Sequence, residues 1–104
     1  MQTQSYTVMV DDNYHYHFMD ESERRQLAAF DDCAAAIAAC QRLVDDFLQS
    51  AYRPGMTAEA LWASYTRFGD DPFIVTTDEQ CLFSAWDYAR QRCEALCRPG
   101  RDGA

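Results

Sequence analysis

The stretch from Asp31 to Ala51, DDCAAAIAACQRLVDDFLQSA, predicts the longest element of the fold. Its larger apolar residues recur three and four positions apart, which places them along one face of a helix. They are Cys33, Ile37, Cys40, Val44, Phe47 and Leu48. We expect Asp31 or Asp32 to cap this helix, because a short carboxylate accepts hydrogen bonds from the free N–H groups of the first turn. The segment is therefore an amphipathic helix with one face to bury.

Three segments before this helix show the alternation that is typical of strands. Residues 5–10 and 14–18 both alternate, and the turn cluster Asp-Asp-Asn at 11–13 separates them, so the pair predicts a β-hairpin. Residues 25–30 predict a third strand.

Two further helices and one strand are expected after the long helix, with Thr57 and Ser84 as the helix N-caps. The predicted inner faces hold Leu61, Trp62, Tyr65 and Phe68 in the second helix and Trp86, Ala89, Cys93 and Leu96 in the third. Between the two helices, residues 70–72 predict a turn and residues 73–75 predict a short buried strand.

These elements predict one α+β domain over residues 1–98, with the order β-β-β-α-α-β-α. Its small antiparallel sheet consists of an N-terminal β-hairpin or meander and one later strand, and three helices pack on it. We expect residues 99–104 to form a disordered C-terminal tail.

The charge balance disfavours nucleic acid as a partner. Nine arginines against 17 acidic residues give a net charge of −8, and the arginines are not clustered in the sequence. The N-terminus has no segment typical of a signal peptide, and no apolar run is long enough to cross a membrane. We therefore expect a cytoplasmic protein whose five cysteines are reduced thiols.

His15 and His17 are the candidate metal ligands, because alternate residues of a strand lie on one face, about 6.6–7 Å apart along the chain. An acid such as Asp11, Asp20 or Glu21, or a cysteine, would have to complete the site. The alternative is an exposed polar sheet face without a metal, which the sequence favours. We therefore expect no cofactor.

The other candidate chemistry is limited to the cysteines. Cys33, Cys40 and Cys93 fall on apolar helix faces and are expected to act as small core residues, whereas Cys97 near a helix end is the candidate reactive thiol. The chain has no lysine, only four glycines and no phosphate-binding or nucleophile motif, which disfavours an enzyme.

Several strings of the sequence resemble those of a group of small bacterial proteins to which no activity is assigned. The strings are VDDNYH at 10–15, MDESER at 19–24, YRPGM at 52–56, FGDDPFIV at 68–75 and FSAWDYA at 83–89. The resemblance spans nearly the whole chain and implies no catalytic residue.

The order of strands and helix is also similar to the sheet-plus-helix DNA-binding modules of plant ethylene-response factors and phage integrase arms. Those modules use cations on the outer sheet face to bind DNA. The corresponding face here offers Thr7, Met9, His15 and His17. At best Arg24 or Arg25 adds a cation, so the face lacks the cations that such binding needs and the resemblance implies architecture alone.

We therefore expect a non-enzymatic protein-interaction or regulatory module that binds a protein partner or a second copy of itself. The candidate interaction surface is the exposed sheet face, with Met9, His15, His17 and Met19, joined by the loop-proximal aromatics Tyr52, Tyr65 and Tyr88. Metal or small-ligand binding at His15 and His17 is the alternative, and nucleic-acid binding is a further one.

Overall fold

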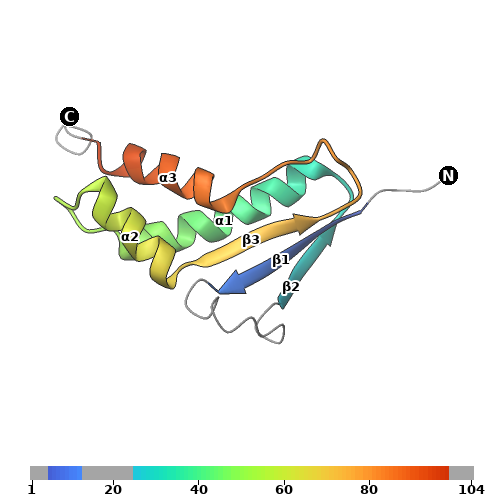
Figure 1. The fold of residues 1–104 in the computed structure, drawn as a ribbon, viewed down its shortest axis with the longest axis horizontal. Helices are drawn as coiled ribbons and strands as arrows, with labels where there is room; N and C mark the ends of the chain where they lie inside the picture. The colour runs from blue at the N-terminus through green and yellow to red at the C-terminus, as the bar shows by residue number, and fades with distance from the viewer. Residues whose placement is uncertain (1–4, 13–24, 99–104) are drawn as a thin grey trace.

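The computed structural model describes residues 5–12 and 25–98. These residues form a three-stranded antiparallel sheet and three helices, which confirms the predicted α+β class (Figure 1). In chain order the elements are β1 (Tyr6–Asp12), β2 (Arg25–Phe30), α1 (Cys33–Ala51), α2 (Ala58–Phe68), β3 (Asp70–Val75) and α3 (Ala85–Leu96). The predicted strand over 14–18 and the predicted tail over 99–104 lie outside the described residues.

The sheet has the order β2-β1-β3, so β1 pairs with a strand on each side. Tyr6, Val8 and Val10 alternate along β1 and are buried, and the first two belong to a core cluster with residues of α1. On β2, Ala28 pairs with Val8 and Gln26 pairs with Met9, which leaves Leu27 as the extra residue of a bulge. The alternation in β1 thus decides which face of the sheet receives the helix.

All three helices begin where the sequence predicted. The side-chain oxygens of Asp32, Thr57 and Ser84 accept hydrogen bonds from the backbone N–H three residues later, at 2.7, 3.1 and 3.2 Å. Of the two aspartates before α1, it is therefore Asp32 that caps the helix.

The segment 70–72 was predicted to be a turn, and this prediction is wrong. It begins β3, because α2 ends at the extended residue Gly69 and the chain runs directly into pairing with β1. Pro72 is buried opposite Val10, and a proline fits here because β3 is an edge strand. Val75 is 53% exposed, so the run 73–75 is only partly buried.

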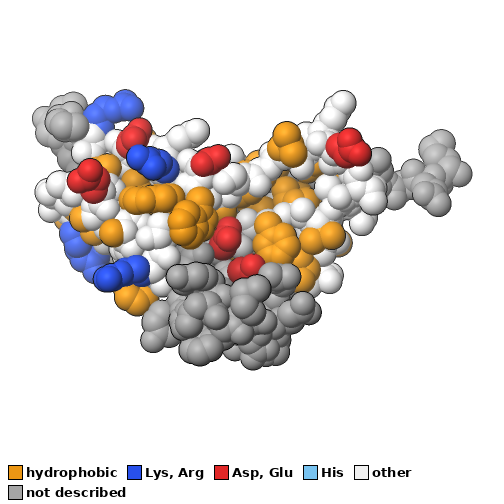
Figure 2. Space-filling model, viewed as in Figure 1, with side chains coloured by type: hydrophobic (Ala, Val, Ile, Leu, Met, Phe, Trp, Pro, Cys, Tyr) orange, Lys and Arg blue, Asp and Glu red, His pale blue; other side chains and the backbone are white. Residues whose placement is uncertain are grey.

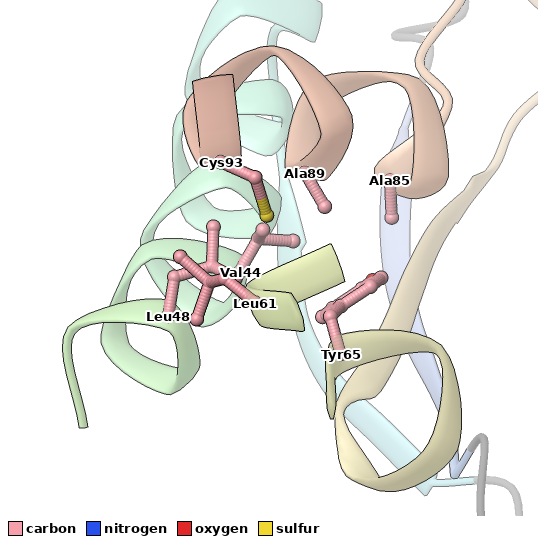
Figure 3. Close-up of a cluster of buried hydrophobic side chains, with 7 residues drawn as sticks. All are labelled: Val44, Leu48, Leu61, Tyr65, Ala85, Ala89 and Cys93. Carbon is pink, nitrogen blue, oxygen red and sulfur yellow. The ribbon is translucent and has the colours of Figure 1, made fainter. Parts of the chain in front are cut away.

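The core consists of two clusters. One lies between the three helices, where side chains of α1, α2 and α3 point toward one another (Figure 3). It contains Val44, Leu48, Leu61, Tyr65, Ala85, Ala89 and Cys93. The other lies between the sheet and the N-terminal half of α1 and contains Tyr6, Val8, Ala36, Cys40 and Cys81.

Two aromatic residues predicted to face the core are exposed instead. Trp86 is 41% exposed and Phe68 is 56% exposed. The inner face of α3 consists of the small residues Ala85, Ala89 and Cys93, which allow α3 to lie close to its neighbours. Trp86 follows Ala85 in the helix and consequently lies at the edge of this face.

Candidate functional site

Two tryptophans and an arginine form a cluster at the surface where α2 and α3 meet. We call Trp62, Trp86 and Arg90 the α2–α3 aromatic surface. The indole rings of Trp62 and Trp86 meet edge to face with 5.5 Å between their centroids, and Cζ of Arg90 lies 5.8 Å from the ring centroid of Trp62. This edge-to-face contact and the cation–π contact are both favourable geometries for aromatic rings.

The core beneath this surface holds it in place. Trp62 stacks on Tyr65 at 6.1 Å between ring centroids, and Tyr65 is fully buried. The Tyr65 hydroxyl donates a 2.7 Å hydrogen bond to the backbone oxygen of Asp70, at the start of β3. Trp86 lies in the first turn of α3, two residues after the Ser84 cap. The side chains therefore project from packed helices rather than from loops.

The α2–α3 aromatic surface is accessible. Trp86 and Arg90 are exposed, Trp62 is half-buried, and Arg90 makes no ion pair with any residue in the described part of the chain. Hydrophobic side chains lie over α2, α3 and β3 on the face that Figure 2 shows, with charged side chains at their margins and between them. Exposed apolar surface of this kind is typical of a protein contact site.

Each tyrosine that was predicted to join an interaction surface has contacts within the domain, and Tyr52 and Tyr88 are partly exposed. Tyr65 belongs to the core. Tyr88 is half-buried and its hydroxyl donates a 2.8 Å hydrogen bond to Oδ2 of Asp45, whose Oδ1 binds Nε of Arg92 at 3.1 Å. Burial and the bond to Asp45 raise the pKa of Tyr88 to about 12. Tyr52 caps the end of α1 and packs against the helical core.

The predicted sheet-face site falls only partly within the described residues. Met9 is half-buried on the face of β1 opposite to Val8 and Val10, and Phe73 is its partner in β3. His15, His17 and Met19 lie outside the described residues, so the metal site and most of the predicted surface stay predictions. Within the ranges 5–12 and 25–98, no group of three or more histidine, cysteine or acidic residues could hold a metal ion.

Two aspartates face each other on neighbouring strands at the end of the sheet. Asp71 in β3 is the register partner of Asp11 in β1. Burial, followed by the nearby charge of Asp11, raises the pKa of Asp71 to about 6. Asp71 is therefore a half-buried carboxylate whose ionised form is disfavoured.

The expectation that all five cysteines are reduced is wrong for Cys33 and Cys81, which form a disulfide. Their separation of 48 residues gives no local spacing signal, which is why the sequence placed Cys33 only on an apolar helix face. Cys40 and Cys93 are buried thiols, as predicted, and burial raises the pKa of each to about 11. Cys97 is half-buried, and its reactivity stays a prediction.

The chain matches no family model, no curated protein and no solved structure. Among the described residues, no helix is long and apolar enough to cross a membrane.

Proposed function

We propose that this protein is a non-catalytic module that binds a protein partner through the α2–α3 aromatic surface. The observation that carries the proposal is the pairing of exposed Trp86 with half-buried Trp62, whose ring has the Arg90 guanidinium over it. Tryptophan and arginine are the residue types most enriched at the energetic centres of protein interfaces. Because packed helices already hold these side chains, ordering them on binding would cost little free energy.

The charge of the chain supports a protein rather than a nucleic acid as the partner. A net charge of −8 repels phosphate groups at long range, and a single arginine at this surface cannot offset it. Arg90 is also engaged with an aromatic ring, a contact that suits a desolvated protein interface.

The test compares capture of proteins from a native lysate by four immobilised forms of the chain. These are the wild type, Trp86→Ala, Arg90→Ala and the control Leu27→Ala. Leu27 is a matched control because it is 48% exposed against 41% for Trp86, and it lies on β2 rather than at the α2–α3 aromatic surface. Circular dichroism verifies that all four forms are folded.

We expect one partner whose affinity falls about 30-fold in Trp86→Ala, the effect of losing about 2 kcal/mol at an interface centre, and falls measurably in Arg90→Ala. Leu27→Ala should bind that partner like the wild type. Equal capture by all four forms would contradict the proposal, as would a loss confined to Leu27→Ala. If sedimentation shows that only a second copy of the chain occupies the surface, the proposed partner class is wrong.

A further inference from the structure

We propose that the Cys33–Cys81 disulfide is a thiol-exchange site, at which a dithiol reductant opens the loop between β3 and α3 without unfolding the domain. The loop covers residues 76–84. The disulfide joins it to Cys33, the first residue of α1. This inference stands apart from the proposed partner, because it concerns a covalent bond between the start of α1 and the loop before α3.

The two cysteines of this bond differ in exposure. Cys33 is half-buried, whereas Cys81 is only 8% exposed and packs in the core cluster with Tyr6, Val8 and Cys40. An attacking thiolate must reach a sulfur along the S–S axis, so the partner with the greater exposure is the site of attack. The structure therefore favours attack on Cys33, with Cys81 as the leaving group.

The exchange runs in two balanced steps. A thiolate of the dithiol attacks the sulfur of Cys33, the Cys33–Cys81 bond breaks, and Cys81 leaves as a thiolate that takes up a proton. The second thiol of the reductant then loses its proton and attacks the reductant's own sulfur in the mixed disulfide, which releases the Cys33 thiolate. The dithiol is oxidised to a disulfide by two electrons, and the protein disulfide is reduced to two thiols.

The position of Cys33 favours the second step. Cys33 is the first residue of a 19-residue helix, where free backbone N–H groups stabilise a negative charge. A better stabilised thiolate leaves faster in thiol–disulfide exchange. The Asp32 carboxylate opposes this effect in part, although its Oδ1 is bound to the backbone N–H of Ala35 at 2.7 Å.

Apart from the disulfide, the loop is held at its α3 end by Phe83, which packs against both core clusters. The Tyr6 hydroxyl donates a 2.7 Å hydrogen bond to Oδ2 of Asp78. Two further hydrogen bonds of Asp78 lie within the loop: its backbone N–H donates to Oγ1 of Thr76, and its Oδ1 accepts from the backbone N–H of Gln80. By contrast, the helical core and the pairing of β1 with both of its neighbours involve no residue of the bond. Reduction is therefore expected to open the loop locally.

The experiment follows thiol alkylation and hydrogen exchange in the wild-type chain. Purified protein is equilibrated in mixtures of reduced and oxidised dithiothreitol, quenched in acid, alkylated and digested, and mass spectrometry measures the alkylated fraction of each cysteine. Parallel hydrogen exchange compares peptides from the 76–84 loop with peptides from α2 and β1. The Cys97→Ser variant is the control for thiol–disulfide exchange that involves the half-buried thiol of Cys97.

Before reduction, we expect Cys33 and Cys81 to be protected from alkylation. With dithiothreitol, both become alkylated together, the loop loses its protection from hydrogen exchange, and α2 and β1 stay protected, with exchange rates that rise no more than the loss of global stability allows. Addition of oxidised dithiothreitol restores the bond and the slow exchange. Cys97→Ser behaves in the same way.

Three results would overturn the proposal. They are free Cys33 and Cys81 in protein purified without reductant, pairing of either with Cys40 or Cys97 on reoxidation, and loss of protection from hydrogen exchange in α2 and β1 on reduction. Cys81→Ser provides a second measurement, because it breaks the bond without a reductant. Its loop should exchange as fast as that of the reduced wild type, and an unchanged loop would also overturn the proposal.

Discussion

Gly69 lies where α2 ends and β3 begins, against the buried ring of Tyr65. A Cβ added at Gly69 would lie 2.5 Å from Cδ1 and 2.9 Å from the backbone oxygen of Tyr65. The oxygen cannot move without disturbing the end of the helix. The φ of Gly69 is −79°, which any residue can adopt, so glycine is required here only because a larger side chain has no space.

The first prediction is that Gly69→Ala lowers the free energy of unfolding by about 3 kcal/mol, the upper end of the range for overpacking. Urea denaturation measures it. Gly55→Ala is the control, because Gly55 has a φ of 84° but no atom within 4 Å of an added Cβ. The control should lose only the strain of a left-handed alanine, about 1 kcal/mol. A loss at Gly69 no larger than the loss at Gly55 would contradict the packing described.

The second prediction concerns Asp71, whose pKa in the folded protein is raised to about 6 from an ordinary value of 3.8. The folded state binds this proton more tightly than the unfolded state, so the group's stabilising contribution is complete below about pH 4 and is lost as the pH rises through 6. Asn cannot ionise. Asp71→Asn should therefore raise the free energy of unfolding at pH 7.5 by about 1–2 kcal/mol, after allowance for partial exposure.

Denaturation at several pH values tests this sign. The gain from Asp71→Asn should vanish below about pH 4, and the exposed control Asp46→Asn should change the free energy of unfolding by less than about 0.5 kcal/mol. A stabilising effect of Asp71→Asn that grows toward low pH would show that the assigned cause is wrong.

At the scale of the elements, local signals predicted the helices well. A cap needs only an oxygen three residues before an N–H, so Asp32, Thr57 and Ser84 could be recognised in the sequence. The start of β3 could not be, because Asp70 and Pro72 favour a turn locally and pair with β1 only through tertiary contact. Residues 70–72 are extended, despite their local preference for a turn, because they pair with β1.

The third prediction tests the cap of α1. Asp32→Ala should lower the free energy of unfolding by about 1 kcal/mol, because the backbone N–H of Ala35 loses its acceptor. Asp31→Ala removes the same charge one residue earlier and is the matched control, with an expected change below about 0.5 kcal/mol. Equal losses in thermal or urea denaturation would mean that charge, rather than the hydrogen bond, stabilises the helix start.

The candidate site was harder to predict than the elements that hold it. The sequence assigned Trp62 and Trp86 to inner faces, because both fall within apolar stripes of their helices. Which side of an apolar stripe is exposed depends on how the three helices pack. In α3, the residues that contact the core are Ala85, Ala89 and Cys93 rather than Trp86. A local pattern cannot fix that arrangement.

At the scale of the whole molecule, the Cys33–Cys81 bond links the beginning of α1 to the segment before α3. It closes a loop across 48 residues, which in the chain-entropy account of disulfides corresponds to about 4 kcal/mol. The fourth prediction is that Cys33→Ala combined with Cys81→Ala lowers the free energy of unfolding by about 2–4 kcal/mol. Cys97→Ala should change it little, and an equal effect of both variants would contradict a stabilising role for the bond.

The central claim is that the α2–α3 aromatic surface binds a protein, and the chain's only two tryptophans both lie there. The most direct measurement is therefore a fluorine NMR titration of protein labelled with 5-fluorotryptophan, using the partner that the wild type captures and Trp86→Ala does not. We predict that the resonances of Trp62 and Trp86 shift or broaden together as the partner is added, and that saturation occurs at a fixed stoichiometry. Binding of the partner with both resonances unchanged would contradict the claim.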